Sequence, residues 1–148
     1  MKVLITRIDK DLPIPQYAKP GDAGADLYSR IDLSLAPGQR ALIPTGISIA
    51  LPAGYAAFVH PRSGLAIKHG ISMVNAPGTV DASYRGELQV ILINHDKSET
   101  FEIKRGDRIA QLVIQTVEQA DFEEVEYLPG TTRDRKSTRL NSSHLVIS

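Results

Sequence analysis

The sequence predicts an all-β protein, an antiparallel jelly roll or β-sandwich-like barrel with one short helix. Two observations carry this prediction. Short runs of strand-forming residues recur along the chain, with turn residues about every eight to twelve positions. No long amphipathic helix pattern competes with them, and in the first two-thirds of the chain only residues 64–69 have a helical pattern.

The first half of the chain divides into strands at its prolines and glycines. A first strand around Val3 and Ile5 ends at the prolines of 13–15, which cannot donate to a central ladder. Apolar and polar residues then alternate, and strands are predicted over 25–35, over 40–51 with a break at 44–46, and over 55–59. A helical turn over 64–69 follows, with Ser63 as its N-cap and Gly70 as the residue that ends it.

The second half continues the same pattern. Strands are predicted over 71–74, 88–94, 100–103 and 109–117, and a last one is possible over 122–127. Between the first two of these runs, residues 75–87 read as a hairpin with turns at Pro77-Gly78 and at 84–86. We interpret residues 1–130 as one domain and the polar, basic residues 131–148 as a C-terminal arm.

Composition excludes several classes of function. The net charge is zero, from 17 basic and 17 acidic residues, so neither direct nucleic-acid binding nor attachment to an anionic membrane is expected. The chain has no cysteine, and its four histidines are scattered, which leaves little for a thiolate or transition-metal site. The N-terminus has neither a signal-peptide pattern nor a membrane span, so a cytoplasmic protein is expected.

Four segments carry candidate chemistry. Asp81 and Tyr84 lie in the predicted hairpin, where a sheet can hold side chains toward a cleft, although a solvated surface turn has the same composition. Arg62-Ser63-Gly64 and Gln111 offer donors for an anion, although a surface arginine and a solvent-facing glutamine are the plain alternatives. Asp26 offers a hard oxygen ligand that suits Mg²⁺, although it could equally be an exposed turn residue.

Four segments together resemble the trimeric dUTPases, the dUTP diphosphatases. They occur in the order and spacing of that family's first four motifs, and the resemblance covers residues 1 to about 133. The segments are Ala23-Gly-Ala-Asp-Leu-Tyr-Ser29, Pro61-Arg-Ser-Gly-Leu-Ala-Ile-Lys-His-Gly70, Asn75 to Glu87, and Gly106-Asp-Arg-Ile-Ala-Gln-Leu112.

The resemblance implies a jelly-roll homotrimer with active sites at subunit interfaces. It implies Mg²⁺-dependent hydrolysis of dUTP to dUMP and diphosphate, which limits uracil in DNA and supplies dUMP for thymidylate synthesis. By matching position, Asp81 is the implied general base and Asp26 the residue that reaches Mg²⁺ through water. The implied substrate contacts are Arg62, Ser63, Gly64 and Gln111 at phosphate, Tyr84 at deoxyribose, Asn75, Thr79 and Val80 at uracil, Gln89 beside them, and Arg133 in the arm.

The arm departs from the family pattern. Thr132-Arg133 fits the start of the fifth, glycine-rich motif, but no glycine follows Gly130. We interpret residues 134–148 as a segment that stands in place of the family's arm. Two other functions stay open: a dCTP deaminase-like enzyme, which shares the fold, and a nucleotide-binding protein whose turnover is impaired by the missing arm.

Overall fold

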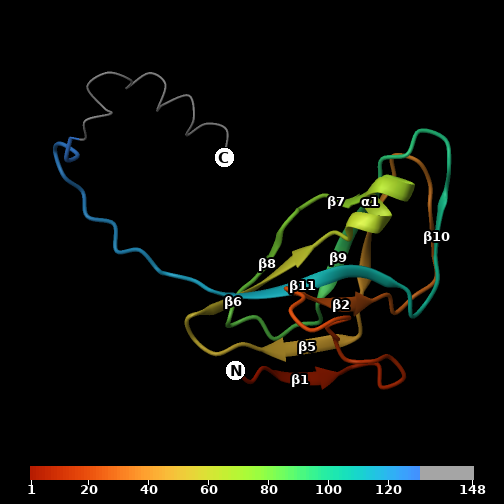
Figure 1. Cartoon of the computed structure of the whole chain (residues 1–148), viewed down its shortest axis with the longest axis horizontal. Coiled ribbons are helices and arrows are strands. Elements are labelled where there is room, and N and C mark those ends of the chain that lie inside the picture. Colours follow the sequence, from red (N-terminus) through yellow and green to blue (C-terminus); the bar gives the residue numbers. More distant parts are fainter. Residues whose placement is uncertain (131–148) are drawn as a thin grey trace. The chain divides into compact units, whose positions relative to one another are not determined.

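Short strands make up most of the computed structural model, which describes residues 1–130. Within these residues, Met1–Glu118 form one compact unit and 119–130 belong to a second. The elements of the first unit are β1 (Leu4–Arg7), β2 (Gly24–Tyr28), β3 (Leu33–Leu35), β4 (Arg40–Pro44), β5 (Ile47–Ala50), β6 (Tyr55–His60), α1 (Ser63–His69), β7 (Ile71–Met73), β8 (Gly78–Val80), β9 (Gln89–Asn94), β10 (Phe101–Ile103) and β11 (Arg108–Thr116) (Figure 1).

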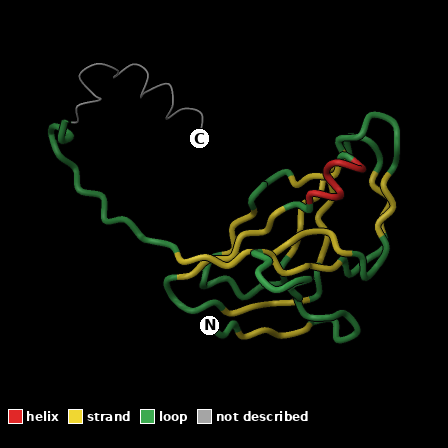
Figure 2. The backbone as a smooth tube through the Cα atoms, in the orientation of Figure 1, coloured by secondary structure: helices red, strands yellow, loops and turns green. Residues whose placement is uncertain are grey.

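Every strand pairing is antiparallel, and partners are mostly distant in sequence. One sheet has the order β2-β11-β6-β8 and another the order β4-β9-β7, while β1 pairs with β5 and β3 with β10. Figure 2 shows α1 as the single helix among strands and loops of the described residues. Such long-range antiparallel pairing is typical of a jelly roll, and the predicted fold class is confirmed.

The core draws on strands from all the sheets. Alternate residues of β9, Val90 and Leu92, are fully buried, because successive side chains of a strand point to opposite faces. Ile47 and Ile49 on β5 and Leu112 on β11 join the same apolar cluster. Burial of this kind contributes roughly 1.5 to 3 kcal/mol for each large aliphatic side chain.

The predicted single strand over 25–35 is wrong, because the chain forms two strands in different sheets. Ser29, which is fully buried, donates its hydroxyl to the Ile31 carbonyl at 2.6 Å and accepts from the Ile31 N–H at 3.2 Å. These local bonds replace ladder bonds and turn the chain between β2 and β3. Residue alternation continues through the turn, so it did not reveal the break.

The predicted helix is present, but its N-cap differs. The helix begins at Ser63, and Arg62 takes the N-cap position with extended backbone angles and no side-chain cap among the described residues. The assignment of Ser63 as N-cap is therefore wrong, and its hydroxyl is not used for capping. Gly70 ends the helix in a left-handed conformation, φ 68°, as predicted.

The predicted hairpin over 75–87 is also wrong in its connectivity. β8 pairs with β6, whereas β9 pairs with β4 and β7, so the strands on either side of Asp81 and Tyr84 belong to different sheets. Residues 81–88 therefore form a loop that crosses between two sheets. Strand periodicity identifies strands and not their partners, which is why the sequence favoured a simple hairpin.

The possible last strand over 122–127 is absent. Residues 119–130 contain no strand or helix, and Phe122 and Tyr127 are 92% and 80% exposed. Residues 118–126 include five acidic side chains. Charged side chains disfavour the pairing of a strand with a sheet edge, so this segment stays in solvent. As for membrane spans, the residues that the structure describes include no helix with the length and apolar character to cross a bilayer.

Candidate functional site

Asp26 lies between two arginines on the sheet that contains β2 and β11. Its side chain is only 7% exposed; Arg62 Nε lies 4.0 Å from Oδ1, and Arg108 Nη1 lies 3.8 Å from Oδ2. Arg62 also donates to the Arg108 carbonyl at 3.4 Å, while its Nε is buried without a partner among the described residues. Two guanidinium groups and one carboxylate leave a net positive charge, and the Arg62 Nε–H is free to donate a hydrogen bond to an anionic ligand or water.

Strand register brings Gln111 to the same place. β11 lies between β2 and β6, so Gln111 is opposite both Asp26 and His60. A Cβ on Gly24 would approach Gln111 Cβ to 2.8 Å and its Oε1 to 2.9 Å, so the glutamine side chain packs over bare backbone. Gln111 is half-buried here, which disagrees with the alternative that it simply faces solvent. We call Asp26, Arg62, Arg108 and Gln111 the arginine cluster.

Sequence reasoning missed Arg108. It lies two residues after the Gly106 turn, in a segment whose chemistry the sequence assigned to Gln111 alone. The pairing of β11 with β2 shifts register between Arg108 and Ala110, and such bulges re-aim side chains. A basic residue at the beginning of a strand after a glycine turn was the available signal.

A hollow of about 340 Å³ adjoins the arginine cluster. Its lining includes Tyr28, Phe101 and both arginines of the cluster. Burial, and secondly the charge of Asp26, raise the pKa of Tyr28, so its phenol stays protonated near neutral pH. The hollow therefore presents one neutral donor beside two cations.

Ser63 and Gly64 lie beside this cluster at the first turn of α1. Both residues are exposed. Ser63 lines a second pocket of about 470 Å³, which Arg62 and Ile67 also line. A Cβ on Gly64 would meet no atom within 4 Å, so internal packing does not require glycine there. Glycine in a helix costs about 0.5 to 1 kcal/mol relative to alanine, and close approach of a ligand would account for it.

Four of the remaining predicted residues, Thr79, Val80, Tyr84 and Gln89, line a separate pocket of about 260 Å³ around β8 and β9. It is lined by Leu42, Thr79, Val80, Tyr84, Leu88 and Gln89. Asn75 lies in the turn three residues before β8, with its Nδ2 3.1 Å from the position of a Cβ on Gly78. Asp81 follows β8 directly and is exposed; its carboxylate forms no ion pair or hydrogen bond with another residue of 1–130. No charged side chain lines the pocket, and Asp81 follows its lining residue Val80 in the chain.

Tyr84 folds back over the end of its own loop. Its hydroxyl donates to the Glu87 carbonyl at 2.9 Å, and its N–H donates to the Asp81 carbonyl at 3.1 Å. A Cβ on Gly86 would lie 2.5 Å from the hydroxyl oxygen and 2.8 Å from Cζ. Only glycine at position 86 permits this ring position.

One chain does not bring the pocket and the arginine cluster together. Val80, next to Asp81, pairs with Ala57, whereas Arg62 lies just beyond the other end of β6. Residues 57–62 in extended conformation span about 16 Å at about 3.3 Å each. The predicted site residues thus form two half-sites, one beside β8 and the other at the arginine cluster beyond His60. Arg133 lies outside the described residues.

The described residues offer no preformed metal cage. Within 1–130, no three His, Cys, Asp or Glu side chains cluster closely enough to hold an ion. Asp26 is a single carboxylate whose two oxygens each face an arginine. Mg²⁺ usually keeps several waters and binds substrate phosphates with one or two carboxylates, so Asp26 fits a contact through water better than direct ligation.

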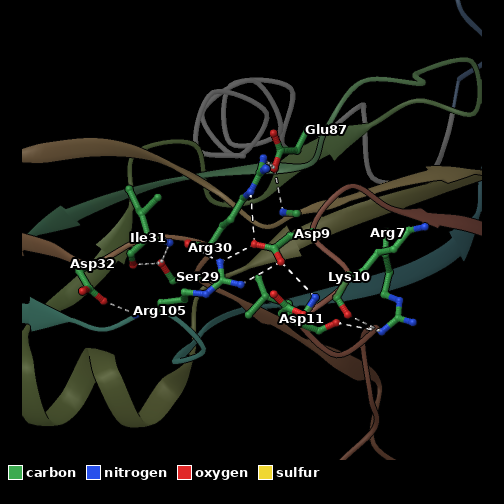
Figure 3. Close-up of polar contacts among 12 residues, drawn as sticks. Arg7, Asp9, Lys10, Asp11, Ser29, Arg30, Ile31, Asp32, Glu87 and Arg105 are labelled. Atoms are coloured by element: carbon green, nitrogen blue, oxygen red, sulfur yellow. Dashed lines mark hydrogen bonds and ion pairs between the residues drawn. The ribbon is translucent and has the colours of Figure 1, made fainter.

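A network of ion pairs outside both half-sites joins distant segments (Figure 3). Arg105 forms a two-pronged pair with Asp9, with Nη2 2.8 Å from Oδ1. Arg30 contacts Asp9 at 3.5 Å through Nε and Glu87 at 3.3 Å through Nη1. Hydrogen bonds from Arg105 lower the pKa of Asp9 from 3.8 to about 2.

The depressed pKa of Asp9 predicts that part of the free energy of unfolding is lost in acid. A carboxyl with a lower pKa in the folded state stabilises the fold above its unfolded pKa, and this contribution is lost as pH falls from about 4 to about 2. Denaturant unfolding of the wild type and Asp9→Asn at fixed protein concentration should show a stability difference at pH 6 that closes over this range. A difference that stays constant down to pH 2 would contradict the assignment.

Comparison with known proteins places the chain in a family. The dUTPase family model matches residues 10–143. The deoxyuridine 5'-triphosphate nucleotidohydrolase of Thermobifida fusca is 62% identical over 133 residues, which are 90% of this chain and 74% of that protein. Its counterpart in Streptomyces coelicolor is 59% identical over 133 residues, 90% of this chain and 73% of that protein.

Solved structures show the same fold at lower identity. The dUTPase of Staphylococcus bacteriophage 80alpha with dUPNHPP superposes with a TM-score of 0.82 and 24% identity, covering 89% of this chain and 93% of that one. The dUTPase from phage phi11 of S. aureus has a TM-score of 0.80 and 24% identity, covering 88% and 100%. With a family match over most of its length and relatives of about 60% identity, the chain belongs to the dUTPase family.

Proposed function

We propose a division of labour by which this dUTPase-family chain hydrolyses dUTP to dUMP and diphosphate. The observation that carries it is the exposed Asp81, which follows Val80 directly, a residue that lines a pocket without charged side chains. A carboxylate without a cationic partner can accept a proton from water, and the pocket beside it suits an uncharged base and sugar. Removal of dUTP limits uracil incorporation into DNA, and the dUMP formed supplies thymidylate synthesis.

Each half-site has a distinct role in this proposal. Asp81 orients water toward the α-phosphorus and takes its proton. Tyr84 lies under the deoxyribose, where its ring leaves no room for a 2′-hydroxyl, while the arginine cluster meets the charge of the triphosphate. The other assigned contacts are Ser63 and Gly64 at phosphate, and Asn75, Thr79, Val80 and Gln89 around uracil.

Magnesium is proposed as a partner of the triphosphate. A variant of the phage phi11 dUTPase is described with a coordinated structural Mg(II) ion. In this chain Asp26 would receive a water of the ion, and the ion when bound would neutralise phosphate charge. The arginines on either side of Asp26 would hold its carboxylate in place for that contact.

The separation of the half-sites favours a homotrimer in which different chains supply them. We predict that mass photometry or light scattering at micromolar concentration gives three times the chain mass of 16.1 kDa. A free monomer that keeps full activity would contradict this prediction, because the proposal takes the Asp81 and the Arg62 of one site from different chains.

The deciding experiment measures diphosphate release from dUTP, dTTP, dCTP and UTP, with and without Mg²⁺. Release from dUTP, at a rate well above that from the other three nucleotides, supports the proposal. Ammonia from dCTP with the triphosphate retained would indicate the deaminase-like alternative, and binding of dUTP without release would indicate a nucleotide-binding protein. A cytoplasmic location and the lack of direct nucleic-acid binding stay predictions from the sequence.

A further inference from the structure

Glu87 lies near the end of the loop that carries Asp81 and Tyr84, and the sequence analysis gave it no role. The side chain of Glu87 turns inward and is 19% exposed. Its Oε2 accepts from the Gly46 N–H at 2.8 Å and from Arg30 Nη1 at 3.3 Å. Because one oxygen takes both bonds, the end of the loop is tied at a single point to the turn between β4 and β5 and to the network of Figure 3.

The main chain of Glu87 holds Tyr84. The Glu87 carbonyl accepts from the Tyr84 hydroxyl at 2.9 Å. That is the hydroxyl's only hydrogen bond among residues 1–130, and Tyr84 is otherwise 44% exposed. A shift of Glu87 would therefore move the only hydrogen-bond partner that fixes the position of the ring.

The supports of Glu87 are themselves fixed. The Arg30 N–H donates to the Pro44 carbonyl at 2.9 Å, and its own carbonyl accepts from Arg105 at 3.0 Å. The next residue, Leu88, is buried; its carbonyl accepts from Thr45 Oγ1 at 2.6 Å. Glu87 is thus held through Arg30 and through its neighbour Leu88, and Figure 3 shows Arg30 between Glu87 and Asp9.

We propose that Glu87 is a positioning residue that sets discrimination between deoxyribose and ribose by holding Tyr84 in place. Glu87 lines neither half-site and acts through its bonds to Gly46 and to the Tyr84 hydroxyl. The proposal rests on the assignment of the pocket around Tyr84 to the sugar. Misplacement by about 1 Å can cost on the order of 10²-fold at a site, so a shifted ring would suffice to relax discrimination.

The test compares full-length Glu87→Ala, Glu87→Asp and Glu87→Gln with the wild type. The aspartate keeps the charge but falls one methylene short of the Gly46 N–H, whereas the glutamine amide oxygen can accept both bonds. Glu102→Ala is the matched control, because Glu102 also accepts a close side-chain hydrogen bond, from Ser34 Oγ at 2.6 Å, at the exposed position of β10. Two ratios are measured: the dissociation constant of UDP over that of dUDP, and kcat/KM for UTP over dUTP.

The expected result is that both ratios move toward equality of ribose and deoxyribose by about 10-fold or more in the alanine and aspartate variants. They should stay within about 2-fold in Glu87→Gln and Glu102→Ala, and Glu87→Ala should add nothing when combined with Tyr84→Ala. A folded Glu87→Asp with unchanged ratios, or additive effects with Tyr84→Ala, would overturn the inference. The binding ratio needs no turnover, so loss of hydrolysis in the wild type would count against the proposed function and not against Glu87.

Discussion

Asp81→Asn is expected to slow dUTP turnover by on the order of 10² to 10⁴-fold while its affinity for dUTP stays within a few-fold. The amide keeps the size of the side chain but cannot accept a proton from water. Asp81 forms no ion pair with a described residue, so the substitution leaves no partner uncompensated and should not alter folding. The measurement is single-turnover diphosphate release together with binding of a non-hydrolysed dUTP analogue.

Asp96→Asn serves as the matched control for this variant. Asp96 caps the Ser98 and Glu99 N–H groups, at 3.2 and 2.7 Å, and an asparagine oxygen can accept the same bonds. The control should therefore turn over dUTP at the wild-type rate. Near-normal turnover in Asp81→Asn would remove Asp81 from the role of base, and a matching loss of affinity would assign it to binding instead.

The second large effect concerns the C-terminal arm. A glycine-rich arm can lay backbone N–H groups against phosphate oxygens and exclude water, whereas 134–148 contain no glycine and include Arg135, Lys136 and Leu140. We expect a chain with a glycine-rich family arm grafted after Arg133 to hydrolyse dUTP on the order of 10² to 10³-fold faster than the present sequence, the range for loss of a fixed oxyanion donor.

The graft is compared with the present sequence for turnover, dUTP binding and thermal stability. Stability should change little, because the strands that form the core end at Thr116. Equal turnover in the two forms would show that the arm is dispensable here. The Asp81→Asn comparison is best made in the grafted form, where the larger starting rate keeps a residual rate measurable.

Much of the fold could be predicted from sequence because strands, turns and the end of the helix leave local signals. Gly70 is an example, since the left-handed position it occupies favours glycine. Partners of strands leave no such signal, and the loop containing Asp81 was therefore assigned to a hairpin when it crosses between sheets. The turn at Ser29 was not predicted, because the buried Ser29 hydroxyl bonds the backbone of Ile31 while apolar and polar residues continue to alternate.

The sequence identified most residues of the candidate site but not how they are arranged in space. Asp26 and Gln111 were both candidates, and the structure places them opposite each other across β2 and β11. Arg108 and Glu87 were missed because their roles depend on partners far away in the chain, such as Glu87 on Arg30, 57 residues distant. The catalytic and substrate-binding assignments themselves stay predictions for the experiments above.

The separation of the two half-sites within one chain has a genetic consequence. If the proposed trimer is a closed ring, each site takes its pocket from one chain and its arginine cluster from the next. Chains carrying Asp81→Asn and chains carrying Arg62→Ala would each be inactive alone, yet every mixed ring would contain one site with both wild-type residues. Two defective alleles expressed together would then complement, and an equal random mixture would recover about a quarter of the wild-type rate.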